Sequence, residues 1–182
     1  MISMLDWLPE CHDLAGVRAL DITLDSREVT RGSIFVALKG HVLDGHDFID
    51  AALANGAVAI LCERAVPQPQ GAVPICIIDN LAGRLGDLTH RFYGSVTEQL
   101  SMIGITGTNG KTSTCQYIAQ SLDFLGKRCG IIGTNGQGLW GQLSETRNTT
   151  PDVVRLHIEL ARQQHHVPQP SANAGFVRSI FR

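Results

Sequence analysis

The feature that most constrains the fold is a glycine-rich stretch at residues 101–114, Ser101-Met-Ile-Gly-Ile-Thr-Gly-Thr-Asn-Gly-Lys-Thr-Ser-Thr114. A short apolar run precedes it, and a segment that can be helical, residues 112–125, follows it. The order strand, glycine-rich turn, helix is typical of a phosphate-binding loop. Glycines turn backbone N–H groups inward around an anion, and the helix adds its positive N-terminal end. We interpret the stretch as a nucleoside-triphosphate site.

The stretch departs from the general phosphate-loop pattern at one position. The pattern G-x-x-x-x-G-K-[ST] requires glycine where this chain has Ile105. The alternative is a glycine-rich turn followed by an ordinary surface lysine, and the strand context together with the Lys-Thr pair favours the phosphate loop. In that interpretation Lys111 would reach the β- and γ-phosphates of ATP, and the hydroxyl of Thr112 would bind Mg²⁺.

Composition narrows the class of protein. The chain has 182 residues, enough for one large or two small domains, and 43% of them are hydrophobic, so a packed core is expected. The net charge of −2 comes from interspersed acids and bases, without the basic stripe of a nucleic-acid-binding protein. No stretch approaches the roughly 18 apolar residues of a membrane span, and the N-terminus does not resemble a signal peptide.

The five cysteines are scattered, odd in number and without any C-x-x-C pair. This pattern predicts neither a zinc site nor a disulfide framework, and it fits a reducing cytoplasm. The histidines at positions 41 and 46 lack the helical spacing of a common metal-binding pair, so no metal is assigned to them.

Residues 1–95 are expected to form a small α/β unit, because strand-like and helix-like segments alternate along them. A short N-terminal helix should precede the first strand. Strands are predicted at residues 19–24, 33–38, 57–62 and 73–78, and helices at residues 48–55 and 81–93. The glycine-rich polar segment at residues 39–47 must be a loop, and composition alone makes it a solvated one.

A second unit is expected to begin at about residue 96, and the strand of its phosphate loop at about Leu100. The next strand is predicted at residues 129–132, followed by a glycine-rich turn at 133–138, a hairpin arm at 139–143 and an amphipathic helix at 153–164. At the start of that helix Thr150 suits the N-cap, Pro151 the first helical position and Asp152 the helix dipole. Residues 165–182 lose the apolar periodicity and are expected to be a divergent tail. Residues 96–164 then make only the truncated first half of a parallel-sheet P-loop ATPase domain.

Several motifs in this order resemble the Mur ligases. They are Asp25-Ser26-Arg27, the run from Ile34 to Gly45, Gly107-Thr-Asn-Gly-Lys-Thr112 and Asn148-Thr149-Thr150. The resemblance covers about residues 20–164. The phosphate motif is shared with folylpolyglutamate synthetase, whereas the N-terminal motifs favour the family members that add the third amino acid of the peptidoglycan peptide. The alternative within the family is the sister ligase that adds the terminal D-Ala-D-Ala dipeptide.

The resemblance implies a domain at residues 1–95 that binds the UDP-MurNAc substrate, and a partial ATP-binding domain at residues 96–164. It implies that Lys111 and Thr112 serve catalysis, with Thr112 also binding Mg²⁺. The residues implied for the ATP phosphates are Gly107, Thr108, Asn109, Gly110, Lys111, Thr112 and Ser113. The residues implied for the UDP-MurNAc-dipeptide are Leu24, Ser26, His41, Val42, Leu43, Asn148, Thr149 and Thr150.

The implied chemistry is ATP-driven formation of an amide bond. The D-glutamate γ-carboxylate of UDP-MurNAc-L-Ala-D-Glu attacks the γ-phosphate of ATP, and the amine of an amino acid displaces phosphate from the resulting acyl phosphate. The family favours meso-diaminopimelate over lysine as that amino acid, and a cytoplasmic monomer is expected. Family ligands that follow the Asn-Thr-Thr helix, and a third domain, are not found in this sequence. We therefore expect the chain by itself not to complete the ligation; a non-catalytic UDP-sugar-binding module and an unrelated phosphate-loop ATPase or kinase are the alternatives.

Overall fold

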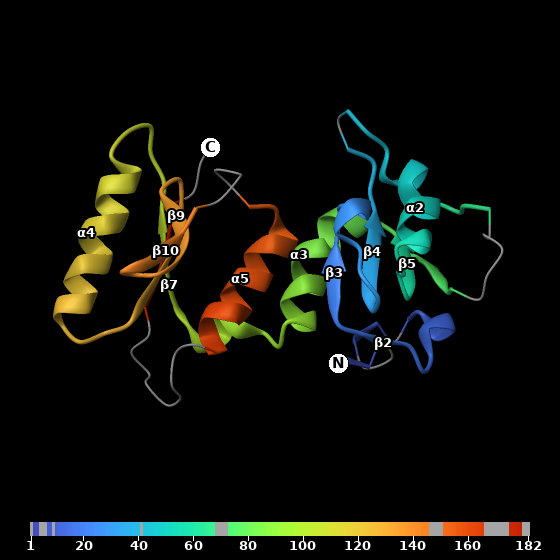
Figure 1. Cartoon of the computed structure of the whole chain (residues 1–182), viewed down its shortest axis with the longest axis horizontal. Coiled ribbons are helices and arrows are strands. Elements are labelled where there is room, and N and C mark those ends of the chain that lie inside the picture. The colour runs from blue at the N-terminus through green and yellow to red at the C-terminus, as the bar shows by residue number, and fades with distance from the viewer. Residues whose placement is uncertain are drawn as a thin grey trace. The chain divides into compact units, whose positions relative to one another are not determined.

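The computed structural model describes residues 2–3, 7–8, 10–40, 42–67, 73–145, 151–165 and 175–179. Its internal contacts divide the chain into two compact units, Met1–Phe92 and Tyr93–Arg182 (Figure 1). Each is an α/β unit with a sheet of its own. Among the described residues no helix is both long and apolar enough to cross a membrane.

The first unit is built on a four-stranded sheet in the order β3-β4-β5-β6, in which every neighbouring pair is parallel. The strands are β3 (Asp21–Thr23), β4 (Ser33–Ala37), β5 (Ala59–Cys62) and β6 (Ile75–Ile77). All residues of β4 and β5 are buried, as parallel strands covered on both faces require. The four predicted strands are thus present, each shorter than expected.

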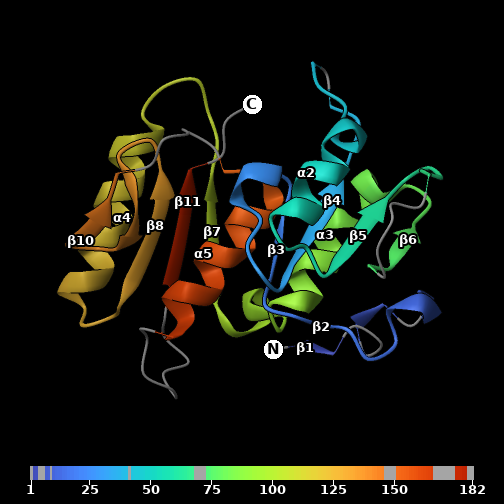
Figure 2. The same ribbon diagram turned by 45° about the vertical axis from the view of Figure 1, so that its right-hand side comes forward.

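Helices α2 (Ile49–Ala54) and α3 (Leu81–Phe92) cover opposite faces of this sheet (Figure 2). Phe35 of β4 and Ile60 of β5 belong to the same core cluster as Ile49 of α2. On α3 the buried side chains recur at helical spacing, at Leu81, Leu85, Leu88 and Phe92. The ring of Trp7 meets that of Phe92 edge-on at 5.0 Å, and its Nε1 donates a hydrogen bond of 2.7 Å to the carbonyl oxygen of Leu88. This contact fastens the N-terminal segment to α3.

Of the predicted N-terminal helix the described residues show Trp7 in helical conformation, and the 3-10 turn η1 (His12–Leu14) follows it. Gly16 follows it with φ +80°, a conformation that ends a helix. The predicted strand at residues 19–24 is divided between β2 (Arg18–Ala19), which pairs antiparallel with β1 (Ile2–Ser3), and β3 in the main sheet. Leu20 lies between them and donates its backbone N–H to the carbonyl oxygen of Gly32, at 2.9 Å.

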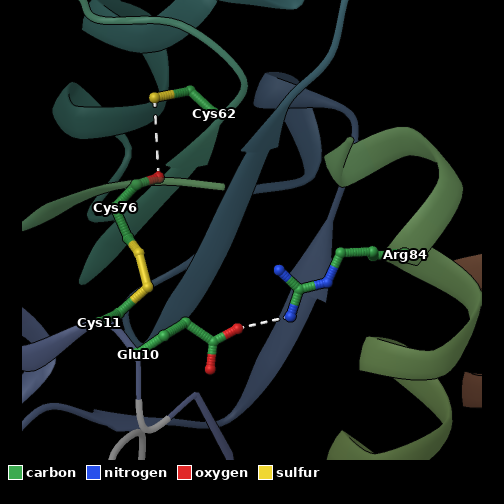
Figure 3. The surroundings of a disulfide bond; sticks show 5 residues. All are labelled: Glu10, Cys11, Cys62, Cys76 and Arg84. Atoms are coloured by element: carbon green, nitrogen blue, oxygen red, sulfur yellow. Dashed lines mark hydrogen bonds and ion pairs between the residues drawn. A yellow bond between two sulfur atoms is a disulfide. The ribbon is translucent and has the colours of Figure 1, made fainter. Parts of the chain in front are cut away.

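The structure corrects the expectation about disulfides. Cys11 and Cys76 are joined by a disulfide, with their Cα atoms 5.9 Å apart and a sequence separation of 65 (Figure 3). The pair forms because η1 packs against β6, a contact that the scattered cysteine positions could not reveal. Cys62, Cys115 and Cys129 are buried, and burial raises the pKa of the Cys62 and Cys115 thiols.

The second unit holds a five-stranded sheet in the order β10-β9-β8-β11-β7. Its strands are β7 (Ser101–Ile105), β8 (Cys129–Gly133), β9 (Gly136–Leu139), β10 (Gln142–Ser144) and β11 (Gly175–Ser179). β9 and β10 form the expected hairpin, but it begins earlier, so the predicted glycine-rich turn shrinks to Thr134 and Asn135. Gly138 lies within β9, where a Cβ would be 2.6 Å from the carbonyl oxygen of Gln142. A glycine in a strand thus marks a close backbone approach here.

The C-terminal tail contributes a strand that the sequence did not predict. β11 lies between β7 and β8 and runs parallel to both, with Val177 opposite Ile103 on one side and Ile131 on the other. A strand of five residues needs no core of its own when two neighbours supply its ladder of hydrogen bonds.

Helices α4 (Lys111–Phe124) and α5 (Val153–His165) cover opposite faces of this sheet (Figures 1 and 2). The alternation of side chains along β8 explains this arrangement. Ile131 packs with Ala119 of α4, whereas the next residue, Ile132, packs with Leu156 and Leu160 of α5. Both helices agree with the predicted segments to within one residue at each end.

Candidate functional site

The glycine-rich loop of the second unit connects the end of β7 to the first turn of α4. Gly107 and Gly110 have φ values of +149° and +78°, in the region that favours glycine. Gly110 directly precedes the first helical residue, Lys111. A Cβ at Gly110 would meet nothing within 4 Å, so the backbone conformation, not space, requires glycine there. The loop therefore delivers the N-terminal end of a 14-residue helix to an exposed turn, an arrangement that suits a phosphate group.

Lys111 lies over the loop it follows. Its Nζ donates hydrogen bonds to the carbonyl oxygens of Gly107 and Thr108, the latter at 3.4 Å. The ammonium group is thus held within the same loop whose N–H groups would cradle phosphates. Thr108 and Asn109 are exposed within that loop, and Ser113 is exposed in the first turn of α4. All seven residues expected at the ATP phosphates accordingly lie together.

Thr112 lies beside a residue that the sequence reasoning did not select. Its Oγ1 is 3.3 Å from Oγ1 of Thr134, in the turn that follows β8. The signal that could have identified Thr134 was its place in a glycine-rich turn directly after a buried strand. The described residues contain no group of three His, Cys, Asp or Glu side chains able to hold a metal ion. A hydroxyl in the first turn of the helix nevertheless fits Mg²⁺, which takes few protein ligands when phosphate oxygens and water supply the rest.

A recess of about 480 Å³ lies elsewhere in the second unit. Arg128, Trp140, Glu159 and Gln163 are among the residues that line it, and none of the predicted site residues does. The phosphate loop does not belong to this recess, whereas Thr112 and Thr134 together line a separate, much smaller pocket.

In the first unit the predicted substrate residues gather at one edge of the sheet. Leu24 directly follows β3, and Ser26 begins the 3-10 turn η2 (Ser26–Glu28). Val42 and Leu43 belong to the loop that follows β4. Because β3 and β4 are parallel neighbours, both segments leave the sheet at its carboxyl edge, where ligands bind in open α/β sheets. His41 lies outside the described residues.

The two segments differ in exposure. Ser26 is buried, and its carbonyl oxygen accepts a hydrogen bond of 2.9 Å from Nδ2 of Asn55, which the sequence reasoning did not single out. The carboxylate of Asp25 accepts the backbone N–H of Arg27 at 3.0 Å. It also accepts hydrogen bonds from the guanidinium of Arg27 and pairs with its charge, which raises the pKa of Arg27. Val42 and Leu43, in contrast, are 92% and 65% exposed. Their exposure leaves both apolar side chains accessible to a ligand.

The third predicted segment, Asn148, Thr149 and Thr150, lies outside the described residues. The structure nevertheless corrects the interpretation of Thr150 as the N-cap of the following helix. Oδ1 of Asp152 accepts the N–H of Arg155 at 2.9 Å, which is the bond that an N-cap side chain makes. Asp152 therefore occupies the N-cap position of α5.

Comparison with known proteins gives matches in both units. The model of the "Mur ligase family, catalytic domain" matches residues 21–93, and that of the "Mur ligase middle domain" matches residues 105–168. The two together span most of both units.

Three curated relatives share the name UDP-N-acetylmuramoyl-L-alanyl-D-glutamate--2,6-diaminopimelate ligase. The protein of that name from Pseudomonas putida KT2440 is 46% identical over 77% of this chain and 29% of its own length. That from Haemophilus influenzae PittEE is 41% identical over 87% of this chain and 33% of its own length. The protein of that name from Chromobacterium violaceum is 38% identical over 92% of this chain and 35% of its own length. The chain therefore spans about a third of the length of these relatives.

Solved structures agree in fold. A structure of a ligase with the same name has a TM-score of 0.70 and 30% identity, over 89% of this chain and 32% of its own. The MurF ligase of Thermotoga maritima, solved in complex with ADP, has a TM-score of 0.58 and 26% identity, over 91% of this chain and 32% of its own.

Proposed function

Because this chain belongs to the Mur ligase family, we propose that it carries the UDP-sugar-binding and ATP-binding portions of an ATP-dependent amide ligase of peptidoglycan synthesis. The reaction would add meso-diaminopimelate to UDP-MurNAc-L-Ala-D-Glu. The observation that carries the proposal is the phosphate loop, in which two positive-φ glycines, Lys111 and Thr112 lie at the start of α4. The chain aligns with 29–35% of the relatives' length, so the activity of the whole ligase is a proposal for this chain.

The choice of amino acid follows from the relatives. Those that share 38–46% identity with this chain are named as diaminopimelate ligases. The sister ligase that adds D-Ala-D-Ala is less well supported, because the MurF structures have lower TM-scores, 0.55–0.58 against 0.70. We place the substrates as UDP-MurNAc-dipeptide, meso-diaminopimelate and Mg-ATP, with no nucleic-acid partner.

The proposed roles divide between the two units. Leu24, Ser26 and the loop at residues 41–43 would contact the UDP-sugar in the first unit. Backbone N–H groups from Gly107 to Ser113 would hold the ATP phosphates, Lys111 would neutralise their charge, and Thr112 would bind Mg²⁺. Asn148, Thr149 and Thr150 would contact the reacting end of the UDP-sugar substrate.

Bound ATP would supply the phosphoryl group that activates the D-glutamate γ-carboxylate of the substrate as an acyl phosphate. Phosphoryl transfer depends on positioning and on neutralising charge, and the residues of this chain supply both. Lys111 would hold the terminal phosphates while the N-terminus of α4 orients them. The amine of diaminopimelate would then displace phosphate and form the amide.

We propose a cytoplasmic, monomeric protein, since its nucleotide-linked substrates are small molecules. Disulfides are rare in the cytosol, so in that compartment the Cys11–Cys76 disulfide would be reduced to two thiols. A second candidate function is UDP-sugar binding without ligation. The predicted UDP-sugar contacts Leu24, Ser26, Val42 and Leu43 all lie in the first unit, which has a sheet of its own.

Thermal unfolding of the 182-residue chain with each ligand tests the proposal. A ligand that binds only the folded state raises the melting temperature, and at 100 times its Kd it adds about 2.7 kcal/mol. We expect Mg-ATP and UDP-MurNAc-L-Ala-D-Glu each to raise the melting temperature. Lys111→Ala should abolish the shift with Mg-ATP and leave the shift with the UDP-sugar intact.

Lys127→Ala is the matched control, because Lys127 follows α4 in the same unit and its backbone N–H bonds to the carbonyl oxygen of Leu122. It should behave like the unsubstituted chain with both ligands. Equal Mg-ATP shifts in Lys111→Ala and Lys127→Ala would refute the phosphate site. A coupled phosphate-release assay distinguishes the two candidate functions, because UDP-sugar binding without ligation predicts no turnover above Lys111→Ala.

A further inference from the structure

The loop after β4 is closed at its neck by hydrogen bonds. The N–H of Gly45 donates to the carbonyl oxygen of Leu38 at 2.8 Å, and the N–H of Gly40 donates to that of Leu43 at 2.9 Å. A Cβ on Gly45 would lie 2.7 Å from the carbonyl oxygen of Leu38, so the two sides of the neck approach as closely as only glycine permits. The exposed Val42 and Leu43 therefore project from a narrow, hydrogen-bonded neck.

A polar network centred on Asp44 fixes this neck. Oδ1 of Asp44 accepts the backbone N–H of His46 at 3.0 Å and lies 2.6 Å from Nδ1 of the His46 ring. Oδ2 accepts a hydrogen bond of 2.8 Å from Nη2 of Arg64. Since an ionised carboxylate can only accept, Nδ1 of His46 carries the proton. Asp44 thus ties its loop both to η3 (Gly45–Phe48) and to the segment that follows β5.

His46 contributes to the network at a cost to its own hydrogen bonding. Its side chain is 4% exposed, and its Nε2 is buried without a hydrogen-bond partner among the described residues. A buried polar atom left unpaired is unfavourable, and an apolar ring could fill the same space without that penalty. What an imidazole adds over an apolar ring at this position is its hydrogen bond to Asp44. His46 therefore contributes to the structure of the loop as well as to the packing of the core.

The network joins the segments that follow β4 and β5, at the edge of the sheet where the segment after β3 also ends. Leu24 and Ser26 follow β3, the Asp44 loop follows β4, and Arg64 follows β5. This is the carboxyl edge that holds the predicted UDP-sugar contacts. No residue of the network was assigned to substrate binding from the sequence.

We propose that Asp44, held by His46 and Arg64, is a positioning residue that presents Val42 and Leu43 to the uridine-nucleotide sugar. The inference rests on the proposed function, in which this loop contacts that substrate. A loop that is ordered before binding loses less conformational freedom when the ligand arrives, so the network raises affinity without touching the ligand.

Amide hydrogen exchange in the ligand-free, 182-residue chain gives the first test. Asp44→Asn should accelerate exchange of the Gly40 and Gly45 N–H groups and leave the amides of β4 and β5 protected. Arg64→Gln should have a smaller effect, because the Arg64 side chain is 61% exposed and an exposed ion pair contributes little. Arg84→Gln is the matched control, because it breaks the ion pair with Glu10 in the same unit and should leave the loop unchanged.

Calorimetric titration of the same variants with UDP-MurNAc-L-Ala-D-Glu gives the second test. We expect a Kd about tenfold higher for Asp44→Asn, two- to threefold higher for Arg64→Gln and unchanged for Arg84→Gln. Failure of the unsubstituted chain to bind would refute the proposed function. Equal binding by all four proteins would overturn the positioning role alone, as would an Asp44→Asn variant that has lost its cooperative melting transition.

Discussion

Asp44 makes the first unit sensitive to acid. The backbone hydrogen bond from His46 lowers the pKa of the Asp44 carboxyl, and the His46 side chain and Arg64 add to the effect. A carboxyl whose pKa is lower in the folded than in the unfolded chain stabilises the fold above the unfolded value, about 3.9 for Asp. That contribution is lost as the pH falls through the lower, folded value. We therefore expect the loop to stay closed at pH 5–7 and to open in acid below about pH 4.

The measurement is melting temperature and loop hydrogen exchange between pH 7 and pH 3. Asp44→Asn cannot lose this charge, so its loop exchange should vary less across the acid range than that of the unsubstituted chain. Asp50→Asn, which changes an exposed carboxylate on α2, serves as the control and should follow the unsubstituted chain. If Asp44→Asn and the unsubstituted chain show the same acid dependence, the carboxylate of Asp44 is not what closes the loop.

At the residue scale, the sequence could place residues in one loop where they are consecutive in the chain, and their roles there stay predictions. The glycines, Lys111 and Thr112 occupy consecutive positions, so their spacing alone placed them in one loop. Other contacts at the two candidate sites come from distant elements. Thr134 lies beside Thr112 at a sequence separation of 22 residues. Asn55 bonds to Ser26 across 29 residues, and Arg64 bonds to Asp44 across 20 residues. Such partners depend on how strands pair, which the local pattern does not specify. The same limit explains why the Cys11–Cys76 pair was not predicted.

At the scale of elements, the N-terminus of α5 permits a direct test. Asp152→Ala removes the side chain that accepts the N–H of Arg155, and loss of an N-cap typically costs about 1 kcal/mol. We expect a lower melting temperature for the second unit and faster exchange in the first turn of α5. Asp152→Asn should behave like the unsubstituted chain, because asparagine caps about as well as aspartate.

Thr150→Ala separates capping from substrate binding at the same junction. With Asp152 as the cap, Thr150→Ala should leave the stability of α5 unchanged and, under the proposed function, weaken binding of the UDP-sugar. A loss of helix stability in Thr150→Ala equal to that in Asp152→Ala would restore the capping interpretation. Hydrogen exchange of the α5 amides distinguishes the two outcomes.

Among the elements, those with strong periodicity or a long apolar run were predicted well. β4 and β5 are continuous apolar runs, and α3, α4 and α5 have clear helix boundaries. The tail was not predicted because β11 has no pattern of its own that separates it from a loop. It becomes a strand through its pairing with β7 and β8, which is a tertiary effect.

At the scale of the whole molecule, the two units differ in how well their sheets are protected. In the first unit every residue of β4 and β5 is buried, and the Cys11–Cys76 bridge ties η1 to β6. In the second unit β7 lies at the edge of its sheet, and none of its five residues is buried. An exposed edge strand opens easily and invites pairing with other chains. The first unit is therefore expected to be the more resistant one.

Limited proteolysis under non-reducing conditions should leave a stable fragment that ends near residue 92, the boundary of the first unit. Mass spectrometry identifies its end. Closing a loop of 65 residues contributes roughly 4 kcal/mol in the chain-entropy account, so dithiothreitol should shorten the fragment's lifetime, and Cys11→Ala should already show the shorter lifetime without it. Uniform resistance through α5 would contradict the difference between the units, and a lifetime indifferent to reductant would mean that the bridge adds nothing to the fold.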